Sequence, residues 1–106
     1  MYDVQDFQKD VIERSKQTPV LVDFWAAWCA PCRMLGPVLE EAAVEASGAW
    51  TLAKVDTERF PQEAMTYGVR SIPNVKLFVD GVVVDEFVGA IPKSAVQAFM
   101  AKTVTA

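Results

Sequence analysis

The feature that most constrains how this chain folds is an apolar run that leads directly into two cysteines. The run spans residues 20–26, has the length of a strand and is nearly continuous in apolar residues. Such a run is typical of a strand buried on both faces, so we expect it at the centre of a sheet. Cys29 and Cys32 follow and open a segment with helical periodicity. The sequence therefore predicts a central strand, a short loop and a helix that begins at two thiols.

Strand-like and helix-like segments alternate along the chain, which predicts an α/β fold with helices on both faces of one sheet. A short strand near residues 2–4 precedes a helix over about residues 5–14, with Asp3 or Asp6 as its cap. Asp80-Gly81 lies between two apolar runs and predicts a two-residue hairpin with antiparallel strands. The other expected elements are a strand over residues 50–55, a helix over 56–67, strands over 74–79 and 82–88, and a last helix capped by Ser94.

The helix after Cys29 is expected to bury one apolar stripe, because its apolar residues recur at spacings of three and four. Pro37 lies inside this helix and is expected to kink it, and Ser47-Gly48 is expected to end it. The stripe consists of Met34, Leu35, Val38, Leu39, Ala42, Ala43 and Ala46.

The composition narrows the classes of function. The 106 residues, 52% of them hydrophobic, suit one domain over residues 1–106. The lack of histidine removes the usual general base and the usual metal ligand. Two cysteines supply only part of the ligand set of a structural zinc, so we expect no metal site. A zinc ion shared between two chains remains the alternative.

The charged residues are spread singly, with a net charge of -4, which is typical of a solvated surface. This pattern predicts binding to neither nucleic acid nor an anionic membrane. The first residues lack the basic start and apolar stretch of a secretory signal, and no apolar run approaches the ~20 residues of a membrane span. We therefore expect a soluble, cytoplasmic monomer.

Cys29 and Cys32 are the candidate reactive groups. In a reducing compartment, two cysteines at this spacing are more often catalytic or metal-binding than structural. A helix N-terminus stabilises a thiolate, and a second thiol three residues on can attack the mixed disulfide that the first one forms. Cβ atoms three apart in a regular helix lie ~5–6 Å from each other, whereas a disulfide needs ~3.5–4.5 Å. We therefore expect Cys29 at the non-helical edge of the first turn, with Pro31 favouring a helix start there; the alternative is an inert pair of buried thiols.

Asp23 lies in the middle of the most apolar strand, with Leu21 and Trp25 on the same face. Burial disfavours the ionised carboxylate, so its pKa is expected to be raised. Because the chain has no histidine, we expect Asp23 to accept the proton of Cys32 through a water molecule. The alternative is a hydrogen-bonded structural acid. Lys54 lies at strand spacing and can reach the same cavity, although its position by itself favours a surface lysine.

An apolar docking patch for extended peptides is expected beside the cysteines. A cis bond between Ile72 and Pro73 would leave the backbone groups of Ile72 free to pair with a substrate chain. Trp28 precedes Cys29 on the loop and is expected to shield the thiol and contact substrate. The patch comprises Ala30, Pro31, Ile72, Pro73, Val88, Gly89 and Ala90.

Eight motifs, in order and spacing, make the chain similar to the thioredoxin family over essentially its whole length. They are Val22-Asp23-Phe24-Trp25-Ala26, Trp28-Cys29 with Pro31-Cys32, Pro37, Ala53-Lys54-Val55-Asp56, Tyr67-Gly68-Val69-Arg70, Ile72-Pro73, Asp80-Gly81 and Val88-Gly89-Ala90. The resemblance implies a central mixed five-stranded sheet flanked by four helices. It also implies a thiol-disulfide oxidoreductase that acts on disulfide-containing protein substrates.

The resemblance further implies the roles of the site residues. Cys29 would attack, Cys32 would resolve the mixed disulfide, Asp23 would be the buried acid, Lys54 its partner, and Pro73 the cis-proline that faces the disulfide. The pair would carry two electrons without a bound cofactor, and a flavin-dependent thioredoxin reductase would return it to the dithiol.

Two departures from the family pattern concern the site. Ala30 stands where the family usually has glycine, and Asn74 where it usually has threonine or a similar residue. The extra methyl group of Ala30 bears on redox potential and substrate preference. Residues 11–20 also resemble thioredoxin domains fused ahead of tetratricopeptide repeats in bacterial co-chaperones. The alternative function is therefore a client-binding module of a longer chain, although two intact cysteines argue against a purely non-redox version.

Overall fold

The structure is a computed structural model that describes residues 1–104, and it contains one mixed five-stranded sheet. The strand order is β1-β3-β2-β4-β5, so the apolar strand β2 lies at the centre, as predicted. β1 and β2 run parallel to β3, whereas β4 is antiparallel to β2 and β5 is antiparallel to β4. The strands are β1 (Tyr2–Asp3), β2 (Val20–Trp25), β3 (Thr51–Asp56), β4 (Asn74–Val79) and β5 (Val82–Val88).

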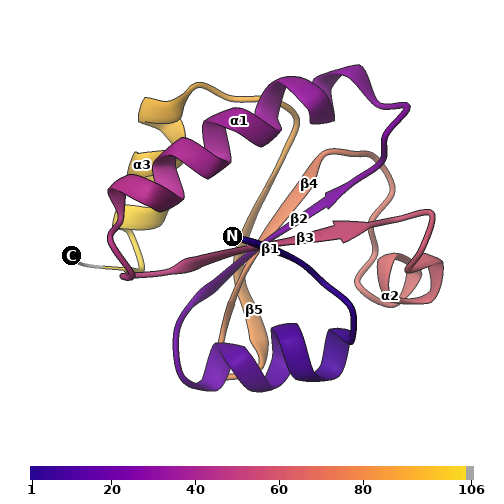
Figure 1. Ribbon diagram of the computed structural model, residues 1–106, viewed down its shortest axis with the longest axis horizontal. Helices are drawn as coiled ribbons and strands as arrows, with labels where there is room; N and C mark the ends of the chain where they lie inside the picture. The colour runs from indigo at the N-terminus through magenta and orange to yellow at the C-terminus, as the bar shows by residue number, and fades with distance from the viewer. Residues whose placement is uncertain (105–106) are drawn as a thin grey trace.

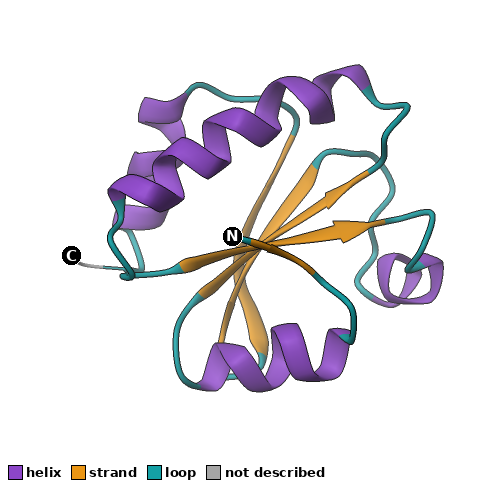
Figure 2. Ribbon diagram, viewed as in Figure 1, coloured by secondary structure: helices purple, strands orange, loops and turns teal. Residues whose placement is uncertain are grey.

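Helices cover both faces of this sheet, which confirms the predicted α/β architecture (Figures 1 and 2). α1 (Ala30–Glu45) and α3 (Lys93–Ala101) pack on one face. The N-terminal helical segment, η1 (Gln8–Glu13) and η2 (Arg14–Lys16), packs on the other face with α2 (Pro61–Thr66). The expected single domain over 1–106 includes residues 105 and 106, which lie outside the described residues.

Side chains of β2 alternate between the two layers. Val20, Val22 and Phe24 face the layer of η1 and α2, whereas Leu21 faces the layer of α1 and α3. Asp23 is two residues beyond Leu21, so its carboxyl group also points toward α1. Lys54 of β3 lies opposite Asp23 in the parallel register and is two residues beyond Leu52, which belongs to the same core. The pleat of two neighbouring strands thus places an acid and a base under the helix that carries the cysteines.

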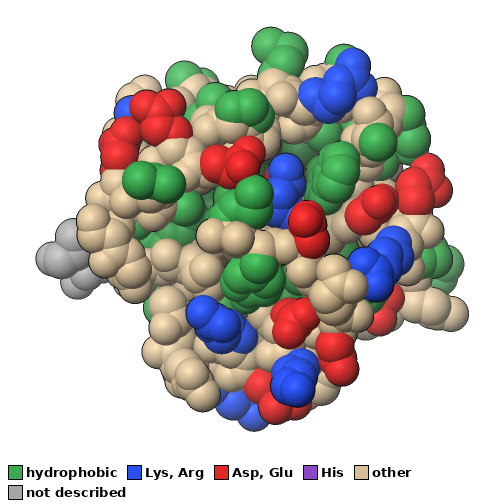
Figure 3. Space-filling view, viewed as in Figure 1, with side chains coloured by type: hydrophobic (Ala, Val, Ile, Leu, Met, Phe, Trp, Pro, Cys, Tyr) green, Lys and Arg blue, Asp and Glu red, His purple; other side chains and the backbone are tan. Residues whose placement is uncertain are grey.

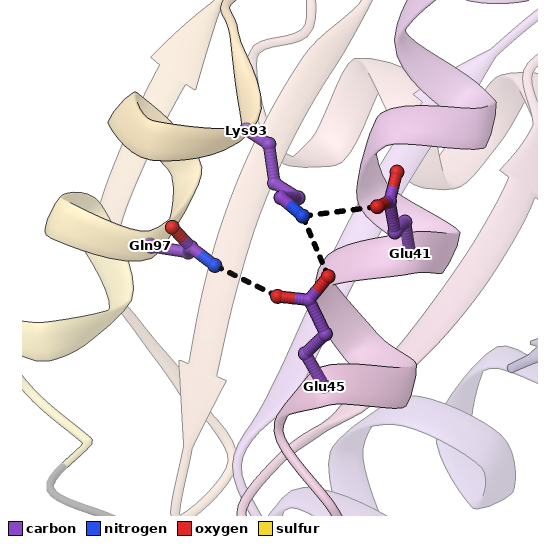
Figure 4. Close-up of polar contacts among 4 residues, drawn as sticks. All are labelled: Glu41, Glu45, Lys93 and Gln97. Carbon is purple, nitrogen blue, oxygen red and sulfur yellow. Dashed lines mark hydrogen bonds and ion pairs between the residues drawn. The ribbon is translucent and has the colours of Figure 1, made fainter.

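Exposed polar contacts connect α1 with α3 (Figure 4). The Lys93 ammonium donates to Glu41 at 2.9 Å and to Glu45 at 2.6 Å, and the Gln97 amide donates to Glu45 at 3.1 Å. Elsewhere on the face drawn in Figure 3, acidic and basic side chains are interspersed. Among residues 1–104, no helix combines the length and apolar character needed to cross a membrane.

The hairpin and the cap of the first helix are confirmed. Asp80 and Gly81 have φ angles of 53° and 83°, the left-handed values that a two-residue turn of this type requires. The Lys9 N–H donates to the Asp6 carboxylate at 3.1 Å, so Asp6 caps the first helix. This helix is π-helical over η1 and continues to Lys16. Neither property is signalled by the apolar pattern.

Three local predictions are wrong. The helix expected from residue 56 begins at Pro61, because the Asp56 carboxylate and carbonyl accept hydrogen bonds from the next residues and form a turn. Ser94 is not a cap, since α3 begins at Lys93 and the amides of its first turn bond to the Pro92 carbonyl. Met34 is 70% exposed, because it lies about 100° around the helix from the buried Leu35.

Candidate active site

The two cysteines lie where β2 passes into α1. Cys29 caps the helix with an extended backbone (φ −88°, ψ 108°), and Pro31 occupies the first turn. The side chains of Cys29 and Cys32 form a disulfide, with their Cα atoms 5.2 Å apart. The Cys32 N–H points at the Cys29 sulfur at 3.2 Å. The expected position of Cys29 outside the regular helix is therefore confirmed, and a helix amide is available to a thiolate there.

Both sulfurs are enclosed by neighbouring chain segments. Cys29 is 4% exposed and Cys32 is 2% exposed. The Cys29 sulfur lies 3.7 Å from the carbonyl oxygen of Ile72, and the Ile72-Pro73 bond is cis as expected. The loop before β4 therefore forms the wall next to Cys29.

The rim of the site mixes exposed and buried members of the expected docking patch. Trp28 is 68% exposed, and its indole N–H donates to Glu58 at 2.7 Å. Pro73 is buried, and its carbonyl accepts the Gly89 N–H at 2.9 Å, which joins the two loops of the patch. Exposed patch residues are Ala30, Pro31, Val88 and Ala90, and half-buried ones are Ile72 and Gly89.

Asp23 is fully buried, and neither of its carboxylate oxygens has a hydrogen-bond partner within residues 1–104. Burial raises the pKa of Asp23 to about 6, the nearby Lys54 ammonium opposes this rise and the Glu40 carboxylate adds to it. The predicted direction of the pKa is confirmed. Among residues 1–104, no protein group supplies the hydrogen bond that the alternative of a structural acid calls for.

Lys54 lies beside Asp23, within reach of its carboxylate. Its ammonium lies 3.8 Å from Asp23 Oδ2 and 4.8 Å from the centre of the Trp25 ring. Trp25 is half-buried, and within residues 1–104 its indole nitrogen has no partner. The pair places a cation beside a buried acid, and this cation opposes the effects of burial and of the Glu40 carboxylate on the acid.

Three further residues near the site are not predicted by the sequence patterns. Glu58 accepts the Trp28 indole N–H, Gly36 of α1 lies against the Lys54 ammonium, and the Glu40 carboxylate of α1 lies near enough to Asp23 to raise its pKa. A glycine inside a helical pattern is a recognisable signal, because it is unfavourable there without a packing reason. Glu58 and Glu40 carry no comparable signal in the sequence.

Comparison with known proteins decides which family this geometry represents. The family model named Thioredoxin matches residues 1–102. The chain belongs to the thioredoxin family. Its disulfide at a helix start, beside a cis-proline loop, is therefore the site of a thiol-disulfide oxidoreductase that acts on protein disulfides.

Named thioredoxins are similar to most of the chain. "Thioredoxin C-2" of Corynebacterium nephridii is 47% identical over 96 residues, which cover 91% of this chain and 87% of that protein. "Thioredoxin 1" of Synechococcus elongatus is 50% identical over 88 residues, 83% of this chain and 80% of that protein. "Thioredoxin M-type, chloroplastic" of Zea mays is 48% identical over 86 residues, 81% of this chain and 52% of that protein. These thioredoxins lend no support to the co-chaperone alternative.

Proposed function

We propose that Cys29 is the attacking thiolate and Cys32 the resolving thiol in the reduction of protein disulfides. Cys29 forms a disulfide with one substrate sulfur and releases the other as a thiolate. Cys32 then attacks the Cys29 sulfur, closes the internal disulfide and releases the second substrate thiol. Two electrons pass from the dithiol to the substrate. The observation that carries this assignment is the position of Cys29 at the helix cap, 3.7 Å from the Ile72 carbonyl at the docking wall.

We propose that Asp23 accepts the proton of Cys32 during the second step. Its burial, its lack of a hydrogen-bond partner within residues 1–104 and a pKa of about 6 support this role. A base whose pKa lies near the working pH both takes and returns a proton readily. Lys54, 3.8 Å away, stabilises the ionised form of Asp23 and so keeps its pKa from rising further.

The substrate chain is proposed to lie across the rim in an extended conformation. Exposed Trp28 and Val88 offer apolar contact on two sides of the disulfide. The Ile72 N–H makes no backbone or side-chain hydrogen bond within residues 1–104, so it is free to pair with a substrate carbonyl. The other members of the proposed surface are Ala30, Pro31, Pro73, Gly89 and Ala90.

The chain is proposed to need no cofactor beyond the Cys29–Cys32 disulfide, because the dithiol itself carries the two electrons. A flavin-dependent thioredoxin reductase is the proposed electron donor. We also propose that the protein works in the cytoplasm as a monomer. Reduction of insulin disulfides, first with dithiothreitol and then with such a reductase, tests the activity and its donor together.

The assignment of the two cysteines predicts a trapping experiment. Cys32→Ser is expected to accumulate stable mixed disulfides on Cys29 after exposure to a disulfide protein, because the resolving thiol is gone. The matched control Cys29→Ser is expected to accumulate few adducts and to reduce no insulin. Mass spectrometry of the adducts locates the bound sulfur. Adducts on Cys32 in natively folded protein would reverse the two roles.

A further inference from the structure

The backbone conformation of Gly36 does not explain why a glycine stands at this position. The chain has five glycines, and Gly36 lies inside α1, while four have positive φ angles that favour glycine: Gly48, Gly68, Gly81 and Gly89. In a helix interior, glycine is less favourable than alanine. A glycine at position 36 therefore calls for a packing reason.

That reason is the Lys54 side chain. A Cβ atom added to Gly36 would lie 3.2 Å from the Lys54 ammonium nitrogen and 3.9 Å from a Glu40 carboxylate oxygen. Carbon and nitrogen at 3.2 Å are closer than ordinary van der Waals contact, so the ammonium would have to move. As it stands, the ammonium rests against the bare backbone of α1.

The same ammonium is held from two other directions. Asp23 Oδ2 lies 3.8 Å away, and the centre of the Trp25 ring lies 4.8 Å away. The Lys54 side chain is 13% exposed, so its position has little freedom. Side chains of β2 and the backbone of α1 thus confine the ammonium. The backbone of α1 can approach this closely because position 36 has no side chain.

We infer that Gly36 is a positioning residue, whose missing side chain lets the Lys54 ammonium remain beside the Asp23 carboxylate. The effect of Gly36 on the reaction rests on the proposed role of Asp23 as a base, whereas its effect on the position of Lys54 does not. The charged groups that act on Asp23 are Lys54 from β3 and Glu40 from α1. The residue opposite Asp23 on β4 is the uncharged Val75.

A side chain at position 36 is expected to raise the proton affinity of Asp23. At an effective dielectric constant of about 20, moving the ammonium ~0.5 Å away from the carboxylate raises the pKa of Asp23 by roughly 0.4. Because alanine favours the helix, Gly36→Ala is expected to fold and to retain the Cys29–Cys32 disulfide.

The experiment is a double-mutant cycle read by carboxyl carbon NMR. The pKa of Asp23 is measured in the natural protein, Gly36→Ala, Lys54→Met and the double variant. Gly36→Ala is expected to raise the pKa by several tenths, in the range of the roughly 0.4 estimated from the charge displacement. In the Lys54→Met background, the same substitution is expected to change the pKa much less, because no ammonium remains to be displaced. Gly36→Ser, whose Cβ occupies the same position, provides a second variant.

An unchanged or lowered pKa in both Gly36 variants would overturn the inference. So would an equal rise with and without Lys54, since Gly36 would then act through general packing. The pKa readout is independent of turnover, so the two proposals can fail separately. If Asp23→Ala exchanged disulfides at the natural rate while the NMR cycle behaved as expected, the base role of Asp23 would fall and the positioning role of Gly36 would stand.

Discussion

A lysine–carboxylate arrangement lies on each of the two sides of α1, and the two arrangements differ in almost every physical respect: on the outside Lys93 of α3 meets two glutamates of α1, and on the inside Lys54 of β3 stands beside Asp23 of β2. On the outside, Lys93 approaches Glu41 at 2.9 Å and Glu45 at 2.6 Å, with the Glu41 side chain 63% exposed. On the inside, Lys54 stands 3.8 Å from Asp23, whose side chain is fully buried. The outer contacts have good hydrogen-bond geometry, whereas the inner pair is too far apart to form a hydrogen bond.

The pKa values move in opposite directions at the two places. Hydrogen bonds from Lys93 lower the pKa of Glu41, and hydrogen bonds to Glu45 and Glu41 raise the pKa of Lys93. Burial raises the pKa of Asp23 to about 6 despite its lysine neighbour. The exposed contacts with Lys93 thus move the pKa of Glu41 further from neutral pH, despite their good hydrogen-bond geometry. The buried Asp23, which has no hydrogen bond to Lys54, is the acid whose pKa lies near neutral pH.

The largest expected effect concerns stability at the inner pair. The difference between a pKa of about 6 in the folded state and the ordinary 3.8 corresponds to about 3 kcal/mol of destabilisation by the ionised carboxylate. Because the folded pKa is raised, this cost is absent below pH ~4 and complete above pH ~6. Asp23→Ala is therefore expected to unfold at a higher denaturant concentration at pH 7. Its free energy of unfolding is expected to rise by about 2 kcal/mol, which is less than the full cost because Lys54 loses its partner.

Denaturant midpoints at several pH values check this effect. The advantage of Asp23→Ala over the natural protein is expected to be small at pH 4 and to grow up to pH 7. The matched control is Glu41→Ala on the outer side of α1, which is expected to bring no gain at pH 7. A clear fall in the stability of Asp23→Ala at pH 7 would mean that the carboxylate is satisfied and that the contrast between the two sides is wrong.

A second effect concerns the rate of the resolving step. A chromogenic thiol is first attached to Cys29 as a mixed disulfide, and its release by Cys32 is followed against pH. Loss of a positioned base typically costs about a hundredfold or more. We expect Asp23→Ala to slow release about a hundredfold at pH 7 and to remove an inflection near pH 6, while Glu41→Ala leaves both unchanged. Retention of the inflection in Asp23→Ala would assign it to another group.

Features that depend on neighbours in sequence were predicted well. The central strand, the hairpin at Asp80-Gly81 and the position of Cys29 at the helix start all follow from local patterns, and the structure confirms them. Local competition explains the errors: the side chain and carbonyl of Asp56 stop the next helix from beginning there, and the carbonyl of Pro92, rather than Ser94, receives the first amides of α3.

The features that were missed depend on distant contacts. The raised pKa of Asp23 was predictable, because a carboxyl group in an apolar strand is buried whatever covers it. The groups of α1 that lie over Asp23 and Lys54 were not predictable, because the approach of Gly36 to Lys54 and of Glu40 to Asp23 depends on how α1 crosses the sheet. The hydrogen bond from Trp28 to Glu58 likewise joins two loops that are 30 residues apart.

The smallest expected effect belongs to the outer arrangement. Lys93→Met removes the donor to Glu41 and Glu45, so the pKa of Glu41 is expected to return toward its ordinary value. A carboxylate with a lowered folded pKa contributes stability above its unfolded pKa, and this contribution is lost as pH falls through the folded value. At pH 7 the variant is therefore expected to unfold at a slightly lower denaturant concentration, and high salt is expected to narrow the difference by screening the exposed charges. Exchange by Cys29 and Cys32 is expected to be unaffected. A large loss of stability that persists in high salt would show that the exposed contacts hold α3 on α1 as firmly as buried ones, and the contrast between the two sides of the helix would no longer hold.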